Sequence, residues 1–141
     1  MRYNKSSGAI IFKIEKEKPV YLLLYSNYWG FVKGLVEQGE QEEATAEREA
    51  QEEAGIKIKI IPGFKDKIKY MFKFEGEFIS KEAVFFVAQA LSKDVKISHE
   101  HNDFKWFSLD EALSIMKHKN QKEMLKKAND FILTWLKQKK L

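Results

Sequence analysis

The chain has 141 residues and a mass of 16.6 kDa, which suits one domain. Apolar residues make up 44% of it, cysteine is absent and the net charge is +4, so a disordered tail, a disulfide framework and a thiolate metal site are excluded. Its apolar runs are far shorter than the roughly 20 residues that cross a bilayer, and its first residues are polar. We expect a soluble, cytoplasmic protein with a single domain over residues 1–141.

The first part of the chain predicts a β-hairpin, a glycine-rich loop and a helix. Residues 8–14 and 20–25 are β-branched and aromatic runs separated by a charged turn, which is the pattern of a hairpin. Three glycines within residues 29–40 indicate a loop whose backbone takes unusual dihedrals or approaches a ligand closely. Residues 42–54 are good helix formers, and Gly55 follows where a left-handed cap is expected.

The middle of the chain predicts strands. Alternating segments cover residues 56–61, 64–74 and 82–91, with a turn at 75–77. A short aromatic strand over residues 104–107 follows.

Two helices are predicted at the end of the chain. Ser108 and Glu111 form a capping box for a helix through Met116. An apolar stripe at helical spacing then predicts an amphipathic helix that packs in the core: Met124, Ala128, Phe131, Ile132 and Trp135. Strands around one central helix, with helices at the end, describe an α/β sandwich with a mixed sheet rather than a doubly wound fold.

Charge is concentrated in one segment. Residues 37–53 hold eight glutamates and one base, Arg48, a net charge of −7, whereas the remaining chain carries 24 bases and 13 acids. One interpretation is a solvated, salt-bridged helix. The other is a divalent-cation site within a basic surface, which suits a ligand with several phosphates.

The spacing of the glutamates bears on the choice between a solvated helix and a cation site. Glu49, Glu52 and Glu53 stand at i, i+3 and i+4, so on a helix their carboxylates share one face. Such like charges repel, and a hard cation that prefers carboxylate oxygens would reverse the sign of the interaction. Taken alone, a three-glutamate face is more often solvent-exposed than metal-binding. The opposite side carries small residues that let a helix pack closely on a sheet: Ala46, Ala50 and Ala54.

The surrounding residues favour the metal site. Gly34 is followed after five residues by Glu40, and after seven more by Arg48-Glu49-Ala50-Gln51-Glu52-Glu53-Ala54-Gly55-Ile56. This pattern resembles the Nudix signature at every fixed position and spacing. The resemblance implies a Nudix-type α/β/α sandwich (α+β) in which a central loop–helix–loop holds divalent cations. Members of this family hydrolyse a nucleoside diphosphate linked to another group.

The resemblance also implies a role for each signature residue. Glu52 and Glu53 would be the main metal ligands, Glu49 a further ligand, and the Gly34 carbonyl would approach the metal. Arg48 would orient the carboxylates through an internal ion pair. The expected cofactor is Mg²⁺ or Mn²⁺, with two or more ions when substrate is bound.

The likeness extends over nearly the whole chain. Residues 8–12, residues 29–34 and the segment Ser98-His99-Glu100-His101 are similar to the asymmetric diadenosine tetraphosphate hydrolases of this family, which form ATP and AMP. In that group the matching glutamate approaches the metal cluster, so Glu100 is implied as an additional ligand or as the base that activates water. Without the resemblance, Glu100 would be interpreted as a solvated loop residue.

Four further residues match substrate-binding positions of that group. Tyr70 and Phe104 match aromatic residues that sandwich an adenine, although core packing is an equal alternative for Phe104. Lys33 and Lys81 match basic residues that line the phosphate path, and either could be an ordinary surface lysine.

The chain departs from the group in the loop before the helix. The group has Pro-Lys-Gly-His where this chain has Val32-Lys33-Gly34-Leu35. Loss of the proline leaves the loop less constrained, and loss of the histidine removes a polar contact near the phosphates. Neither change touches the expected metal ligands.

We therefore expect divalent-metal-dependent hydrolysis of diadenosine tetraphosphate to ATP and AMP by attack of water on a bridge phosphorus. The expected partner is a small nucleotide, with no membrane involved. The first alternative is the same chemistry on nucleoside triphosphates or RNA 5′ ends, although no RNA-binding motif accompanies the lysines. The second is a non-catalytic module that binds adenine nucleotides.

Overall fold

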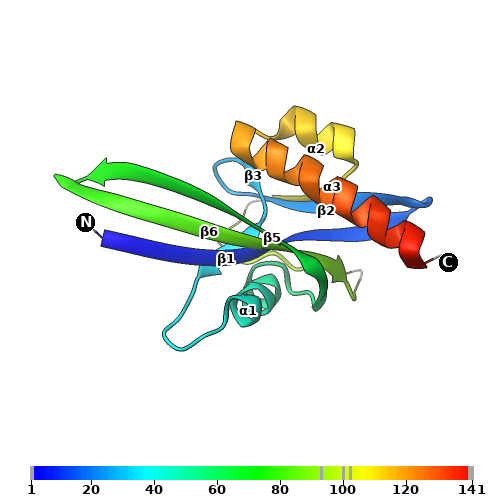
Figure 1. The fold of residues 1–141 in the computed structure, drawn as a ribbon, viewed down its shortest axis with the longest axis horizontal. Helices are drawn as coiled ribbons and strands as arrows, with labels where there is room; N and C mark the ends of the chain where they lie inside the picture. Colours follow the sequence, from blue (N-terminus) through cyan, green and yellow to red (C-terminus); the bar gives the residue numbers. More distant parts are fainter. Residues whose placement is uncertain (1, 93, 100, 102, 140–141) are drawn as a thin grey trace.

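The computed structural model describes residues 2–92, 94–99, 101 and 103–139 (Figure 1). Its elements, in chain order, are β1 (Arg2–Glu15), β2 (Lys18–Tyr25), β3 (Trp29–Gly30), β4 (Val32–Leu35), α1 (Glu42–Ala54), β5 (Ile58–Phe74), β6 (Glu77–Ala90), β7 (Asp103–Phe107), α2 (Leu109–Ile115) and α3 (Lys119–Lys139). The predicted α/β/α sandwich with a mixed sheet is confirmed.

One mixed sheet forms the middle layer. Its strand order is β3-β2-β1-β6-β5, with β4 paired to β1 and β7 paired to β2. Strands β1 and β6 run parallel, whereas β1–β2 and β5–β6 are antiparallel. The same edge of β1 pairs with β4 near Ser7 and with β2 beyond Phe12. Because β1 changes partner, β4 lies beside the second half of α1 and leads into the loop before that helix.

Helices cover both faces of the sheet, with α1 on one side and α2 and α3 on the other (Figure 1). Successive strand residues point to opposite faces. Ile10 and Phe12 accordingly belong to the apolar cluster that includes α2 and α3, and Ala9 and Ile11 to the cluster that includes α1. Burial of these two clusters fixes both helical layers on the sheet.

Most predicted boundaries agree with the structure. Helix α1 has the predicted bounds, and Gly55 caps it in the left-handed region with φ 64°. The capping box at Ser108 is present, and α2 ends one residue before the predicted Met116. The predicted strands at 56–61 and 64–74 form one strand, β5, whose register shifts beside Gly63 at φ 111°. Strand β6 begins at Glu77 rather than at residue 82.

None of the helices in the described part of the chain is both long and apolar enough to cross a membrane.

Candidate functional site

Helix α1 directs its alanines toward the sheet and holds Glu49 and Glu53 beside β4. The alanines at positions 46, 50 and 54 are fully buried, and their small side chains allow the helix to approach the sheet closely. The side chains of Glu49 and Glu53 are 12% and 13% exposed, whereas that of Glu52 is 57% exposed. Glu49 and Glu53 are therefore largely buried, whereas the Glu52 carboxylate is exposed to solvent.

Arg48 connects this face to the loop before the helix. Its Nε and Nη2 donate to the two carboxylate oxygens of Glu40 at 2.8 and 3.0 Å. Its Nη1 donates to Glu49 at 2.8 Å and to Glu52 at 3.0 Å, and Nη2 also donates to the Leu35 carbonyl at 3.0 Å. All five guanidinium N–H donors are thus engaged.

The hydrogen bonds of Arg48 offset part of the repulsion between the α1 glutamates, which the sequence alone left to a metal ion. A cation was expected to be what makes the glutamate face favourable, yet Arg48 already places one positive charge between Glu49 and Glu52. Leu35, which stands where the family group has histidine, enters the network only through its backbone. The Leu35 side chain is exposed, and its backbone carbonyl makes the bond.

Glu40 is a strongly perturbed carboxylate in this network. Hydrogen bonds from Arg48, then from the Thr45 hydroxyl and the Glu37 backbone N–H, lower the pKa of Glu40 to about 2. The same ion pair with Glu40 raises the pKa of Arg48 above its ordinary value. The pair therefore stays ionised across the neutral range.

The shifted pKa of Glu40 predicts an acid dependence of stability. A carboxylate whose pKa is lower in the folded state stabilises the fold above its unfolded pKa, and this stabilisation is lost as the pH falls. For Glu40 the loss is expected between its ordinary pKa of 4.5 and about 2. The melting temperature of the wild type should fall more steeply over this range than that of Glu40→Gln, as followed by circular dichroism. Parallel pH profiles would contradict the assignment.

Glu49 lies directly against Gly34. Gly34 pairs with Ser7 of β1, and a Cβ added to Gly34 would overlap the Glu49 carboxylate. Glycine is required here by close approach, since any side chain would displace Glu49. The predicted proximity of Gly34 to the carboxylate face is therefore a feature of the fold.

Glu53 is held from two sides. Its Oε1 accepts a hydrogen bond from the Lys33 backbone N–H at 2.9 Å, and its Oε2 lies 3.4 Å from His101 Nε2. His101 reaches this position because the Ser98 N–H donates to the Glu53 carbonyl and the Ser98 hydroxyl lies 3.2 Å from His101 Nδ1. Glu100, the predicted additional ligand or base, lies outside the described residues.

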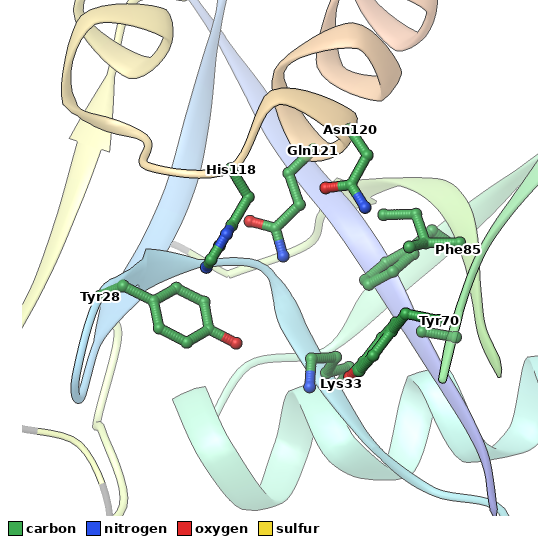
Figure 2. Close-up of a pocket in the computed structure, with 9 residues that line it drawn as sticks. Tyr28, Lys33, Tyr70, Phe85, His118, Asn120 and Gln121 are labelled. Atoms are coloured by element: carbon green, nitrogen blue, oxygen red, sulfur yellow. The ribbon is translucent and has the colours of Figure 1, made fainter. Parts of the chain in front are cut away.

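Two pockets adjoin beside Glu53. The smaller, termed the carboxylate pocket, has a volume of about 120 Å³ and includes Glu53 and His101 in its lining. The larger, termed the aromatic pocket, has a volume of about 390 Å³ and lies between the sheet and the start of α3 (Figure 2). Tyr28 and Lys33 line both pockets. The two pockets therefore meet at Tyr28 and Lys33, and together they are termed the groove, with Glu53 in the wall of one pocket and Tyr70 in the wall of the other.

The predicted substrate residues are only partly brought together. Tyr70 lines the aromatic pocket, and Lys33 lies where the two pockets meet. Lys81 stands directly opposite Tyr70 in the register of β5 and β6, which places both on the same face of the sheet. Phe104 lines neither pocket and packs against the apolar cluster that includes α1, the alternative that the sequence left open.

Sequence reasoning missed several residues of the aromatic pocket. The ring of Tyr28 contacts that of His118 edge to face, with centroids 4.9 Å apart. Phe85 and Gln121 also line the pocket. Tyr28 lies beside the glycine-rich loop, which is a weak signal for a ligand contact, but no local pattern connects the start of α3 to that loop.

The donors on this face suit a hard divalent cation. The three α1 carboxylates and the backbone of Gly34 supply oxygen ligands, the type that Mg²⁺ and Mn²⁺ prefer. Among the described residues, no three His, Asp or Glu side chains already converge as a metal site. Arg48 instead bridges Glu49 and Glu52. The residues therefore fit such an ion in donor type and in the close approach of Glu49 to Gly34.

Comparison with known proteins agrees with this geometry. The sequence model of the NUDIX domain matches residues 3–128. The asymmetrical bis(5′-nucleosyl)-tetraphosphatase of Sus scrofa is 33% identical over 143 residues, covering 91% of this chain and 95% of that protein. Its Caenorhabditis elegans counterpart is 31% identical over 133 residues, covering 91% and 96%. A crystal structure of a C. elegans Ap4A hydrolase binary complex superimposes with a TM-score of 0.83 at 29% identity, covering 93% of this chain and 98% of that one.

Proposed function

The chain belongs to the Nudix family of hydrolases, and from this premise we propose that it hydrolyses diadenosine tetraphosphate to ATP and AMP. The relatives named above, which cover nearly the full length of both chains, support this substrate. So does the resemblance of the sequence to the asymmetric hydrolases.

The observation that carries the proposal is that the two pockets adjoin and share Tyr28 and Lys33. A dinucleoside polyphosphate needs an apolar site for a base, cationic groups for the phosphates and oxygen ligands for a metal, in that order along the molecule. Tyr70 belongs to the aromatic pocket, Lys33 lies at the junction and Glu53 lines the carboxylate pocket. The groove therefore presents these three chemistries in the order that the substrate requires.

Each of these residues has a distinct proposed task. Tyr70 stacks on one adenine, and the Lys33 ammonium pairs with phosphate oxygens, with Lys81 nearby on the same sheet face. Glu49, Glu52 and Glu53, with the Gly34 carbonyl, are the groups that would hold Mg²⁺ or Mn²⁺. Such ions neutralise phosphate charge and lower the pKa of water. Arg48 acts as a positioning residue, because its donors engage protein oxygens.

The reaction is attack of water on a bridge phosphorus, with one new P–O bond formed and one phosphoanhydride bond broken. The proton of the attacking water passes to a base. Glu100 is proposed for this role on the resemblance of its segment. Glu49 and Glu53, which Arg48 and the Lys33 backbone N–H hold in place, keep the polyphosphate in line with the water.

Separation of the products tests the proposed function. The protein is incubated with diadenosine tetraphosphate and Mg²⁺, and the nucleotides are resolved by ion-exchange chromatography. ATP and AMP in equal amounts are expected, with no turnover in excess EDTA and recovery on addition of Mn²⁺. Unchanged substrate, or two molecules of ADP, would contradict the proposal.

The same groove would also accept a mononucleotide with a phosphate chain. Nucleoside triphosphates and RNA 5′ ends are therefore alternative substrates of the same chemistry, and parallel turnover of a nucleotide panel separates them from the dinucleotide. A cytoplasmic location and a single domain over residues 1–141 stay predictions alongside this function.

Gly34→Ala is expected to lower kcat by about 10²-fold, because a displaced ligand misplaces the reacting groups. The added methyl group overlaps the Glu49 carboxylate, so that side chain must move. Steady-state rates with diadenosine tetraphosphate measure the effect, and circular dichroism monitors the fold. A variant that folds normally and keeps the wild-type rate would show that the position of Glu49 does not matter.

A further inference from the structure

Gln121 carries a buried acceptor that the protein leaves unused. This residue lies in the first turn of α3 and is only 8% exposed. Its Oε1 is the only buried side-chain oxygen or nitrogen without a hydrogen-bond partner among the described residues. Since buried polar atoms are nearly always paired, an unpaired one at this position requires an explanation.

Gln121 belongs to the wall of the aromatic pocket, with its amide nitrogen toward the open space and its enclosed oxygen on the side of His118 (Figure 2). Figure 2 shows the Gln121 amide projecting from the start of α3 into the space framed by Tyr28, Lys33, Tyr70 and Phe85. The volume of about 390 Å³ lies within the range of small-molecule sites. An amide among aromatic rings offers directional hydrogen bonds to a flat ligand that the rings can stack on.

The Gln121 amide carries one acceptor and one donor side by side, and a turn about the terminal bond of the side chain brings the enclosed oxygen to the pocket. This pair complements the edge of adenine that carries the exocyclic amine N6 and the ring nitrogen N7, since N6–H donates to the amide oxygen and N7 accepts from the amide nitrogen. Hypoxanthine and guanine present two acceptors at this edge, O6 and N7. Whichever way the amide is turned, one of those acceptors faces Oε1.

We propose that Gln121 is the base-specificity residue of this protein, reading the N6/N7 edge of an adenine bound in the aromatic pocket. The proposal rests on the proposed function in that the ligand is a nucleotide. It goes further by assigning the choice of base to one side chain. Tyr28, Tyr70 and His118 stack on or flank any base, and Gln121 distinguishes adenine from hypoxanthine and guanine.

Binding of nucleoside monophosphates tests this directly, because AMP and IMP differ only at the C6 position and its neighbouring N1 proton. We expect the wild type to bind AMP about tenfold more tightly than IMP or 7-deaza-AMP in isothermal titration calorimetry. Gln121→Met keeps the length of the side chain and removes both polar atoms. It should weaken AMP binding about tenfold to the level of IMP and leave IMP binding nearly unchanged.

Two controls separate recognition from folding. Gln138→Met makes the same change on an exposed part of α3 and should keep the tenfold preference. The melting temperature of Gln121→Met should equal or exceed that of the wild type, because the substitution removes an unpaired buried oxygen. Equal binding of AMP and IMP by the wild type, no binding of either, or an equal loss of both in Gln121→Met would overturn the proposal.

Turnover distinguishes this inference from the proposed function. Preferential hydrolysis of diadenosine over diinosine tetraphosphate, lost in Gln121→Met through a rise in KM rather than a fall in kcat, supports both. Equal turnover of the two dinucleotides overturns the role of Gln121 and leaves the hydrolase intact. No turnover of either, with the preference for AMP retained, overturns the proposed function alone.

Discussion

Glu53→Gln is expected to reduce kcat for diadenosine tetraphosphate by on the order of 10³-fold. The amide keeps the shape of the side chain and can still accept the Lys33 backbone N–H, which the carboxylate accepts at 2.9 Å. It removes one negative charge from the donors proposed to hold the divalent ion. The loss should therefore appear in the rate, with a melting temperature close to that of the wild type. Steady-state kinetics and thermal denaturation measure the two effects.

Glu47→Gln provides the matched control for this variant. Glu47 lies on the same helix and is exposed, so the same chemical change is made away from the groove. Its rate should equal that of the wild type. Wild-type activity in Glu53→Gln would instead remove Glu53 from the site.

Arg48→Met is expected to reduce both stability and activity, because the Arg48 guanidinium donates hydrogen bonds to oxygens of α1, of β4 and of the loop between them. Its removal leaves three carboxylates close together without their shared cation: Glu40, Glu49 and Glu52. The side chain of Arg48 is 24% exposed, so solvent screens part of this effect. A loss of about 2–3 kcal/mol in the free energy of unfolding is expected. Urea denaturation measures it, and kcat should fall by at least 10²-fold.

A double variant separates the two consequences of losing Arg48. Arg48→Met combined with Glu40→Gln removes the stranded charge in the loop, so part of the lost stability should return. The activity should not return, because Glu49 and Glu52 still lack the group that positions them. If the double variant recovered the rate as well, Arg48 would act only through the stability of the loop.

The helix and its ends were predictable because their causes are local. Residues of high helix propensity fill positions 42–54, and Gly55 takes the left-handed cap for which glycine is suited. The spacing of Glu49 and Glu53 on a helix likewise fixes their common face. The family signature implied only that the Gly34 carbonyl approaches the metal. The approach of Gly34 to Glu49 was not predicted, since it depends on the pairing of β4 with β1.

The aromatic pocket was not predictable in full because it is assembled from distant segments. Tyr28 precedes β3, Tyr70 lies on β5, and His118 and Gln121 lie at the start of α3. Only the packing of α3 on the sheet brings them together, and no local pattern encodes that contact. The resemblance implied that Arg48 forms an ion pair with the carboxylates. Its full set of five hydrogen bonds could not be predicted, because one of them depends on where the chain places the Leu35 carbonyl.

Strand boundaries were missed for a related reason. The Pro62-Gly63 pair reads as a break between two strands, yet β6 supplies a continuous partner on both sides of it. The chain absorbs the interruption as a shift in register at Gly63 rather than as a turn. Tertiary pairing thus overrides a local breaker signal that would end an isolated strand.

Anomalous scattering from crystals soaked with Mn²⁺ and a non-hydrolysable analogue of diadenosine tetraphosphate tests the central claim most directly. We predict anomalous peaks within coordination distance of Glu49 and Glu53, phosphates beside Lys33, and one adenine in the aromatic pocket. Manganese bound elsewhere, or a dinucleotide that leaves the groove between Glu53 and Tyr70 empty, would contradict it.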